Sequence, residues 1–177
     1  MATMILLPAG ENSVSSDWEY VGTGISNVWG ALTTDNGATS YAKCDDTGES
    51  FQIDFANPSV AEGDITSIDS VRFLSSGKSA HRSATTRCGM KYYVPSGNAD
   101  ENAVYQPHRT DFTTINGTAR SHANGTSGGW TYANLEDLQM RCTLASSAEA
   151  YVSYFAMEVT YTEAAVTDSA TFFGANF

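Results

Sequence analysis

The feature that most constrains this chain is an alternation of apolar and polar residues with a period of two. The segment FQIDF places Phe51, Ile53 and Phe55 on one side of an extended strand, with polar residues between them. Strands that are buried on one face show this period, because successive side chains point to opposite faces. The chain has no long segment with a helical period, so the pattern predicts a fold built from β-strands.

The longest alternating segment is YVSYFAMEVTY, residues 151–161. One of its faces carries five apolar residues, interrupted only by Ser153: Tyr151, Phe155, Met157, Val159 and Tyr161. The opposite face, which includes Val152, Tyr154 and Ala156, is also largely apolar. A strand that is apolar on both faces is typical of the centre of a sheet. We therefore expect residues 151–161 to form a central strand.

Further strands are predicted in MKYYV, SNVWGALTT, SYAKC, SVRFLSS, AVYQPHRTDFTT, ARSHA and MRCTLAS. A short first strand is expected at Met4 to Leu7, ended by Pro8 and Gly10. Turn signals separate the segments, among them Asp46-Thr47-Gly48, Ser76-Gly77, Asn116-Gly117 and Asn124-Gly125. Asn-Gly favours hairpins because both residues tolerate positive φ. Eight to ten short strands at this spacing predict an antiparallel sandwich or barrel.

Length and charge limit the classes of function. The 177 residues predict one domain at 1–161 with a C-terminal arm at 162–177, and the net charge is −11. Such an acidic chain repels phosphate backbones and anionic lipid headgroups, so we expect neither nucleic acid nor membrane as a partner. The first ten residues lack the basic start and long apolar core of a secretion signal.

Cys44, Cys88 and Cys142 are an odd number of widely separated cysteines, each within an expected strand. A disulfide framework requires pairs, and zinc sites use closely spaced ligands. We expect three buried free thiols, which fits assembly in a reducing cytoplasm.

Candidate chemistry is sparse, and we expect no enzyme, no metal and no cofactor. Gly77-Lys78-Ser79 lacks the upstream glycine of a phosphate-binding loop, so a strand-ending turn is expected. Asp45, Asp46 and Glu49 offer hard oxygen ligands, but their spacing matches no metal loop. The alternative is a cation bound in this hairpin turn.

The three histidines, His81, His108 and His122, form no pair at metal-ligand spacing. His108 lies near Asp111, but no serine or cysteine stands in a Gly-x-Ser-x-Gly turn. A triad assembled in space, and with it a hydrolase, stays open as the third hypothesis. Asn116-Gly-Thr118 and Asn124-Gly-Thr126 match the glycosylation pattern, which hairpin turns also explain. Trp18, Trp29 and Trp130 are expected in the core, with a sugar-stacking platform as the alternative.

One helical signature interrupts the strand pattern, in WTYANLEDLQMRCTLAS. Asn134 and Asp137 form an expected capping pair, and Leu135, Leu138 and Gln139 give about one and a half turns of half-apolar helix. The pattern stops being helical by Thr143.

This stretch resembles a pattern in small jelly-roll structural proteins of tailed bacteriophages. The matching residues are Trp130-Thr131, Leu135, Leu138-Gln139, the strand around 142–144, and Glu158-Val159-Thr160-Tyr161. The segments DWEYVG and NVWGALTTDNGATSYAKCDD resemble the opening of such domains more loosely. The resemblance implies an antiparallel jelly-roll β-sandwich in which one short helical turn leads into the last two strands.

The resemblance also implies a function. Proteins of this kind serve as capsid decoration (cement) proteins and as modules of tails or fibres. The first hypothesis is a decoration protein that binds the outside of a phage head, with the major capsid protein and itself, as a homotrimer, as partners. It would be assembled in the host cytoplasm. The second is a carbohydrate- or receptor-binding module of a tail or fibre.

The end of the chain, EAAVTDSATFFGANF, carries three of the eight phenylalanines in its last six residues: Phe172, Phe173 and Phe177. Burying one such side chain is worth about 1.5–3 kcal/mol, so three exposed ones would be a liability without a partner. We expect an arm that docks on an adjacent subunit or on the capsid protein. The alternative is an edge strand of its own sandwich.

Overall fold

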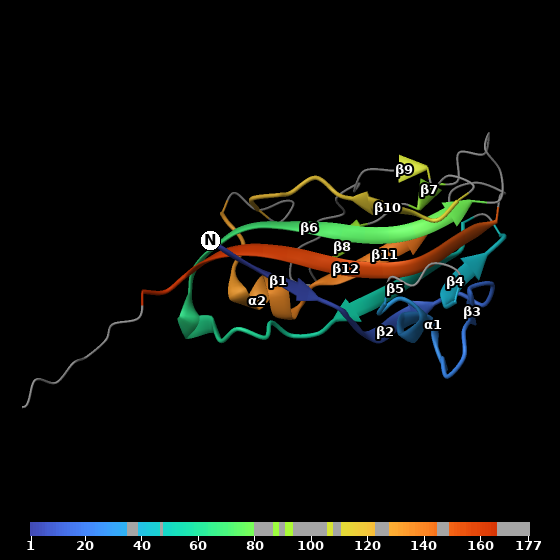
Figure 1. Ribbon diagram of the computed structural model, residues 1–177, viewed down its shortest axis with the longest axis horizontal. Helices are drawn as coiled ribbons and strands as arrows, with labels where there is room; N and C mark the ends of the chain where they lie inside the picture. The colour runs from blue at the N-terminus through green and yellow to red at the C-terminus, as the bar shows by residue number, and fades with distance from the viewer. Residues whose placement is uncertain are drawn as a thin grey trace, which may run out of the picture.

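The computed structural model describes residues 1–34, 39–46, 48–79, 87–88, 91–93, 106–107, 111–122, 128–144 and 149–165. Two antiparallel sheets pack on one another in this part of the chain (Figure 1). The predicted all-β class, an antiparallel jelly-roll-like β-sandwich, is confirmed. The predicted arm residues Phe172, Phe173 and Phe177 lie outside the described residues.

The first sheet, sheet A, is built around the two longest strands. Its order is β10-β6-β12-β4-β3, and β1 pairs with β12 as well. The bounds are β1 (Ala2–Leu6), β3 (Glu19–Val21), β4 (Tyr41–Cys44), β6 (Ile65–Ser79), β10 (Thr113–Asn116) and β12 (Ala150–Glu163). The predicted central strand is therefore confirmed, since β12 has β6 on one side and both β4 and β1 on the other.

The second sheet, sheet B, has the order β2-β5-β11-β8. Its strands are β2 (Pro8–Val14), β5 (Ser50–Phe55), β8 (Lys91–Tyr93) and β11 (Gln139–Thr143), and a separate short pair joins β7 (Arg87–Cys88) to β9 (Gln106–Pro107). β5 carries the FQIDF pattern, and Phe51, Ile53 and Phe55 are all buried as predicted.

The core lies between the two sheets. Phe51 of sheet B meets Phe155 of sheet A with ring centroids 5.6 Å apart, and Trp18 packs edge-on against Phe51 at 4.6 Å. Trp18 and Trp130 are both buried, as expected for core tryptophans. Trp29 is partly buried and packs against the same core. Aromatic rings of this size fill the space that two facing sheets enclose.

A β-bulge in β12 changes the predicted assignment of its faces. The register against β6 shifts between Val152 and Tyr154, which leaves Ser153 as the extra residue. Val152 and Phe155, expected on opposite faces, are both buried in the core, whereas Tyr151, expected on the same face as Phe155, is only half-buried. The expectation was wrong at Tyr151 because an extra residue moves every side chain beyond it to the other face.

The N-terminal segment passes from one sheet to the other. β1 pairs with β12 in sheet A, and after Leu7 the chain continues as β2, which pairs with β5 in sheet B. The expected short first strand ends before Pro8, as predicted, but Gly10 is not part of its end, because Pro8 begins a second strand that contains Gly10. A proline is tolerated there since it is the first residue of a strand at a sheet edge.

Two short α-helices and one 3₁₀ turn interrupt the strands. α2 (Tyr132–Glu136) forms where the helical signature was predicted, but its cap is Thr131 and not Asn134. α1 (Val28–Ala31) lies in SNVWGALTT, which was wrongly predicted as a strand. Asn27 caps α1 by accepting a bond from the Gly30 N–H at 2.7 Å. The 3₁₀ turn η1 (Glu62–Asp64) precedes β6.

Two of the expected turns do not form. Ser76-Gly77 lies within β6, so Gly77-Lys78-Ser79 is neither a phosphate loop nor a turn. Gly117 follows β10, and the chain stays beside β6 there, because the Gly117 N–H donates to the Phe73 carbonyl at 2.8 Å. Its φ is not positive, so no Asn-Gly hairpin forms there. The turn at Gly48 is confirmed, with φ of 94°.

Candidate functional site

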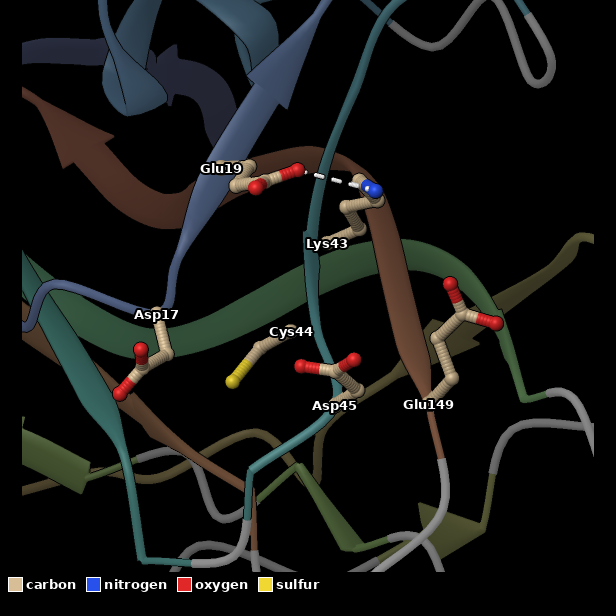
Figure 2. A pocket seen from close by; sticks show the side chains of 6 residues that line it. All are labelled: Asp17, Glu19, Lys43, Cys44, Asp45 and Glu149. Carbon is tan, nitrogen blue, oxygen red and sulfur yellow. Dashed lines mark ion pairs between the residues drawn. The ribbon is translucent and has the colours of Figure 1, made fainter.

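A small cavity lies where β3, β4 and the start of β12 meet (Figure 2). Its volume is about 40 Å³, and it is lined by Asp17, Glu19, Lys43, Cys44, Asp45 and Glu149. β4 supplies Lys43 and Cys44, and β3 supplies Glu19. Lys43 Nζ lies 2.9 Å from Glu19 Oε2, and this hydrogen bond raises the pKa of Lys43. A cavity of this volume has room only for water or a group of similar size.

The acidic groups around this cavity do not converge on one centre. In Figure 2 the carboxylates of Asp17, Asp45 and Glu149 point in different directions around the Cys44 thiol. No group of three His, Cys, Asp or Glu residues within the described ranges could hold a metal ion. Asp45, Asp46 and Glu49, the residues weighed as cation ligands, therefore form no such group in the described part.

Cys44 is a structural thiol. Its side chain is buried, and its Sγ lies 3.5 Å from the Asp46 carbonyl oxygen. Burial raises the pKa of the thiol to about 11, so it stays protonated at neutral pH. The thiolate is the nucleophilic form of cysteine, so this thiol is poorly suited to covalent catalysis. Cys142 is also a buried thiol outside any disulfide, so the expectation is confirmed for two cysteines; the side chain of Cys88 lies outside the described residues.

The histidines weighed for catalysis are not brought together in the described part. His81 and His108 lie outside the described residues. His122 is exposed, and its Nδ1 lies 3.3 Å from the Oγ of neighbouring Ser121. Asp111, weighed as a partner of His108, is exposed as well.

Sequence reasoning missed a cluster of aromatic residues on the outer face of sheet A. Tyr41 meets Tyr151 at 5.4 Å between ring centroids and Phe112 at 6.2 Å. Lys78 Nζ lies 4.5 Å from the centre of the Tyr151 ring and 5.1 Å from that of Phe112. Burial, and a hydrogen bond that the Tyr151 hydroxyl donates to the Glu149 carboxylate, raise the pKa of Tyr151 to about 12. The rings meet edge-on or tilted and share one cation, so this cluster is a contact network rather than a flat stacking platform.

Two larger hollows border η1 at the α2 end of the sandwich. The first has a volume of about 260 Å³ and is lined by Glu62, Ile65, Thr66, Ser67, Ile68, Trp130, Thr131 and Tyr132. The second has a volume of about 310 Å³ and is lined by Val60, Asp64, Tyr161, Glu163 and Ala164. The N-terminus and the end of β12 lie at this same end of the molecule (Figure 1). The end of the sandwich thus combines hollows with both ends of the described chain.

The walls of these hollows are held in place by specific bonds. The Tyr132 hydroxyl donates to the Val60 carbonyl at 2.9 Å, and the Ala164 N–H donates to the Asp64 carbonyl at 2.8 Å. Trp130 Nε1 donates to the Arg120 carbonyl at 2.8 Å. The α2 segment and the end of β12 are therefore both tied to the residues around η1. The helical signature in the sequence was the signal that could have located this site.

The predicted interaction residues Phe172, Phe173 and Phe177 cannot be added to this geometry, because they lie outside the described residues. None of the described helices is long and apolar enough to cross a membrane.

Comparison with known proteins gives a likeness to solved structures only. No protein-family model and no curated protein matches the chain. Among solved structures, the chain is similar to a family 29 carbohydrate-binding module from Piromyces equi, at 12% sequence identity and a TM-score of 0.43. The match covers 89% of this chain and 91% of that module.

Proposed function

We propose that this chain is a virion structural protein, a capsid decoration (cement) protein that binds the outer surface of the head of a tailed bacteriophage and stabilises it. The observation that carries the proposal is the unit formed by residues 130–161. Trp130, Leu135, Leu138 and Tyr161, which belong to the resemblance described above, are all buried in one core. The residues that resemble phage jelly-roll proteins thus act together as a packed unit.

The α2 end of the sandwich is the surface proposed to face the capsid. Its two hollows offer apolar side chains such as Ile65 and Tyr132 beside the carboxylates of Glu62 and Asp64. Apolar centres with a polar rim are typical of protein interfaces. The proposed partners are the major capsid protein and two further copies of this chain, as a homotrimer at a three-fold position. The proposed place of assembly is the host cytoplasm.

The experiment that tests this proposal is a count on purified particles. A decoration protein is expected in hundreds of copies per head, and heads stripped of it should open at a lower temperature than decorated ones. Binding that occurs only on the assembled lattice stabilises the lattice by mass action. Adding the protein back should restore the opening temperature. Equal opening temperatures of stripped and decorated heads would contradict the stabilising role.

A second candidate is a carbohydrate- or receptor-binding module of a tail or fibre, and the hollow of about 260 Å³ favours it. This hollow combines Trp130 and Tyr132 with the hydroxyls of Thr66 and Ser67, and aromatic and hydroxyl groups together suit a sugar. A glycan array with the wild-type chain and a Tyr132→Ala variant tests this candidate. Specific binding that the variant loses, with only a few dozen copies per particle, would favour it over decoration.

A further inference from the structure

β1 is an edge strand that lacks protection against pairing with another strand. Among the described residues only β12 pairs with it, on one side, with an unbroken register from Ala2 opposite Tyr161 to Leu6 opposite Met157. β1 contains no charged residue, no proline and no bulge. Natural edge strands normally carry at least one of these features, because an open edge is a template for another chain.

Three other edges of the two sheets differ from β1 in this respect. β2 contains Pro8 and Glu11, and its register against β5 shifts twice. β3 is only three residues long and carries Glu19 in an ion pair with Lys43. β8 is also three residues long and contains Lys91. The remaining edge, β10, is also uncharged and pairs with β6 without a register shift. It is four residues long and mostly polar, so β1 differs from it in its length and its apolar side chains.

The exposed apolar side chains gather at the same edge. Four large hydrophobic residues are exposed in the described part: Met1, Ile5, Leu7 and Tyr20. Three of them belong to β1 or flank it, with exposed fractions of 95% for Met1, 44% for Ile5 and 38% for Leu7. An unpaired backbone edge and an apolar strip thus coincide, as in sheets that bind a partner by strand addition.

We infer that the outer edge of β1 binds residues 166–177 of a neighbouring copy of this chain as an added antiparallel strand. Two properties of that segment match the edge. It carries Phe172, Phe173 and Phe177, which can contact the apolar strip. Asp168 is its only charged side chain, so pairing places little charge beside the uncharged strand. Twelve residues span at most about 40 Å, which is ample for a five-residue edge of about 17 Å.

Geometry favours a neighbouring copy over the same chain. β12 ends beside Ala2, at the start of β1. Every strand pair in the described part is antiparallel. An antiparallel strand added to β1 would start at the Leu6 end of β1. The segment of the same chain starts at the Ala2 end, so it would first run the length of β1 and then turn back. Phe172 and Phe173 would then fall in the turn. A segment from a neighbour reaches the Leu6 end directly.

Such a contact joins two different surfaces, the arm of one copy and the edge of the next. Contacts of this head-to-tail kind close into a ring when the rotation between copies is a whole fraction of a turn, and a ring of three copies would make the homotrimer proposed above. The closure of these contacts into a trimer rests on the proposed function. The arm contact is tested on the isolated protein, so the arm contact and the decoration function can fail separately.

The test is photo-crosslinking of the purified full-length chain. A benzophenone amino acid replaces Thr3, which is exposed on β1 and leaves Ile5 and Leu7 intact. Equal amounts of ¹⁵N-labelled and unlabelled protein are mixed, irradiated and analysed by mass spectrometry. We expect crosslinks from residue 3 to residues 166–177 that join a labelled to an unlabelled peptide. Crosslinks that join only peptides with the same label, or an absence of crosslinks to residues 166–177, would overturn the inference.

Matched variants give a second readout, self-association measured by sedimentation. Ile5→Lys should weaken association by about tenfold or more, because it places a charge in the apolar strip. It should not harm the fold, since Ile5 lies opposite Glu158. Tyr20→Lys, an equally exposed position on β3, is the control and should associate as the wild type does. The double variant Phe172→Ser with Phe173→Ser should behave like Ile5→Lys.

The outcomes separate the two proposals. A chain that is monomeric at every concentration, or Ile5→Lys and Tyr20→Lys variants that associate equally, would overturn the arm contact even if the protein decorates heads in hundreds of copies. Mixed-label crosslinks in a protein that never appears on particles would instead support the arm contact and contradict the decoration function.

Discussion

Gly117 is a residue whose role is packing rather than turning. A Cβ atom at this position would lie within 2.9 Å of three atoms of the Phe73 ring, which is buried. The ring and the backbone of residue 117 are in such close contact that even a methyl group has no space. The sequence suggested an Asn-Gly hairpin here, and it could not show that a ring from another strand covers the glycine.

We expect Gly117→Ala to lower the free energy of unfolding by about 1–3 kcal/mol, as overpacking of a core does. Urea unfolding measures the change. Gly63→Ala is the control, because a Cβ at Gly63 meets nothing within 4 Å. A loss at Gly117 no larger than that at Gly63 would mean that the Phe73 ring moves aside freely.

The thiol of Cys44 gives a prediction about pH. Its pKa is raised from 9.0 to about 11 by burial, so the folded state holds the proton more tightly than the unfolded state does. Between pH 9 and 11 the unfolded state loses this proton first, and stability should fall as the pH rises through that window. Below pH 9 this thiol makes no pH-dependent contribution.

Alkylation followed by peptide mass spectrometry tests whether the Cys44 thiol is buried and protonated in the folded protein. At pH 8 we expect iodoacetamide to leave Cys44 unmodified in the folded protein and to modify it rapidly in urea, because reaction needs both access and the thiolate. Rapid modification of the folded protein at pH 8 would contradict the burial of this thiol.

At the scale of elements, α2 depends on its cap. Thr131 Oγ1 accepts a bond from the Asn134 N–H, and the Asn134 side chain accepts one from the Thr131 N–H, at 3.2 and 3.1 Å. The sequence predicted a cap at Asn134, three residues too late. Both residue types cap helices, and the pattern of short polar residues alone does not choose between them.

We expect Thr131→Ala to destabilise the protein by about 1 kcal/mol, since it leaves helix N–H groups without an acceptor. Thr118→Ala, at an exposed position outside any helix, is the control and should change little. Thermal unfolding compares the two. Equal stability of both variants would mean that α2 is held by Leu135 and its other packing contacts alone.

The strands with a clean alternation could be predicted, and the irregular elements could not. β5 follows its pattern at every position, because one of its faces meets the core. The prediction at α1 failed because part of its N-terminal capping comes from a distant strand: Glu11 of β2 accepts the Val28 N–H at 2.6 Å. The Asn27 cap was a local signal that could have been used, whereas the contact to Glu11 depends on the tertiary fold.

At the scale of the whole molecule, the site was only partly visible in the sequence. The resemblance in residues 130–161 located the α2 end, because these residues are contiguous in the chain. The unprotected edge of β1 could not be foreseen, since an edge is defined by the strands that are missing beside it. The sequence of Ala2–Leu6 would also suit a strand in the middle of a sheet, so it does not show that β1 lies at an edge.

Removing residues 166–177 tests the division of the molecule into sandwich and arm. We expect the shortened chain to be soluble, with an unfolding midpoint close to that of the full chain, because β12 keeps its bonds up to Glu163. Its binding to stripped heads should be much weaker. Circular dichroism and a pelleting assay measure the two properties, and a shortened chain that is unfolded would show that the arm belongs to its own core.

The central place of β12 has a consequence for how the protein is made. Ribosomes synthesise β6 and β1 long before β12, yet both strands lie directly beside it, and Ala2 finds its partner only at Tyr161. Contacts between such distant parts of a chain form slowly and leave strand edges open in the meantime. We expect nascent chains halted before residue 150 to be digested by protease throughout their length. Chains halted after β12 has left the ribosome should resist it, so the fold would be acquired in one late step.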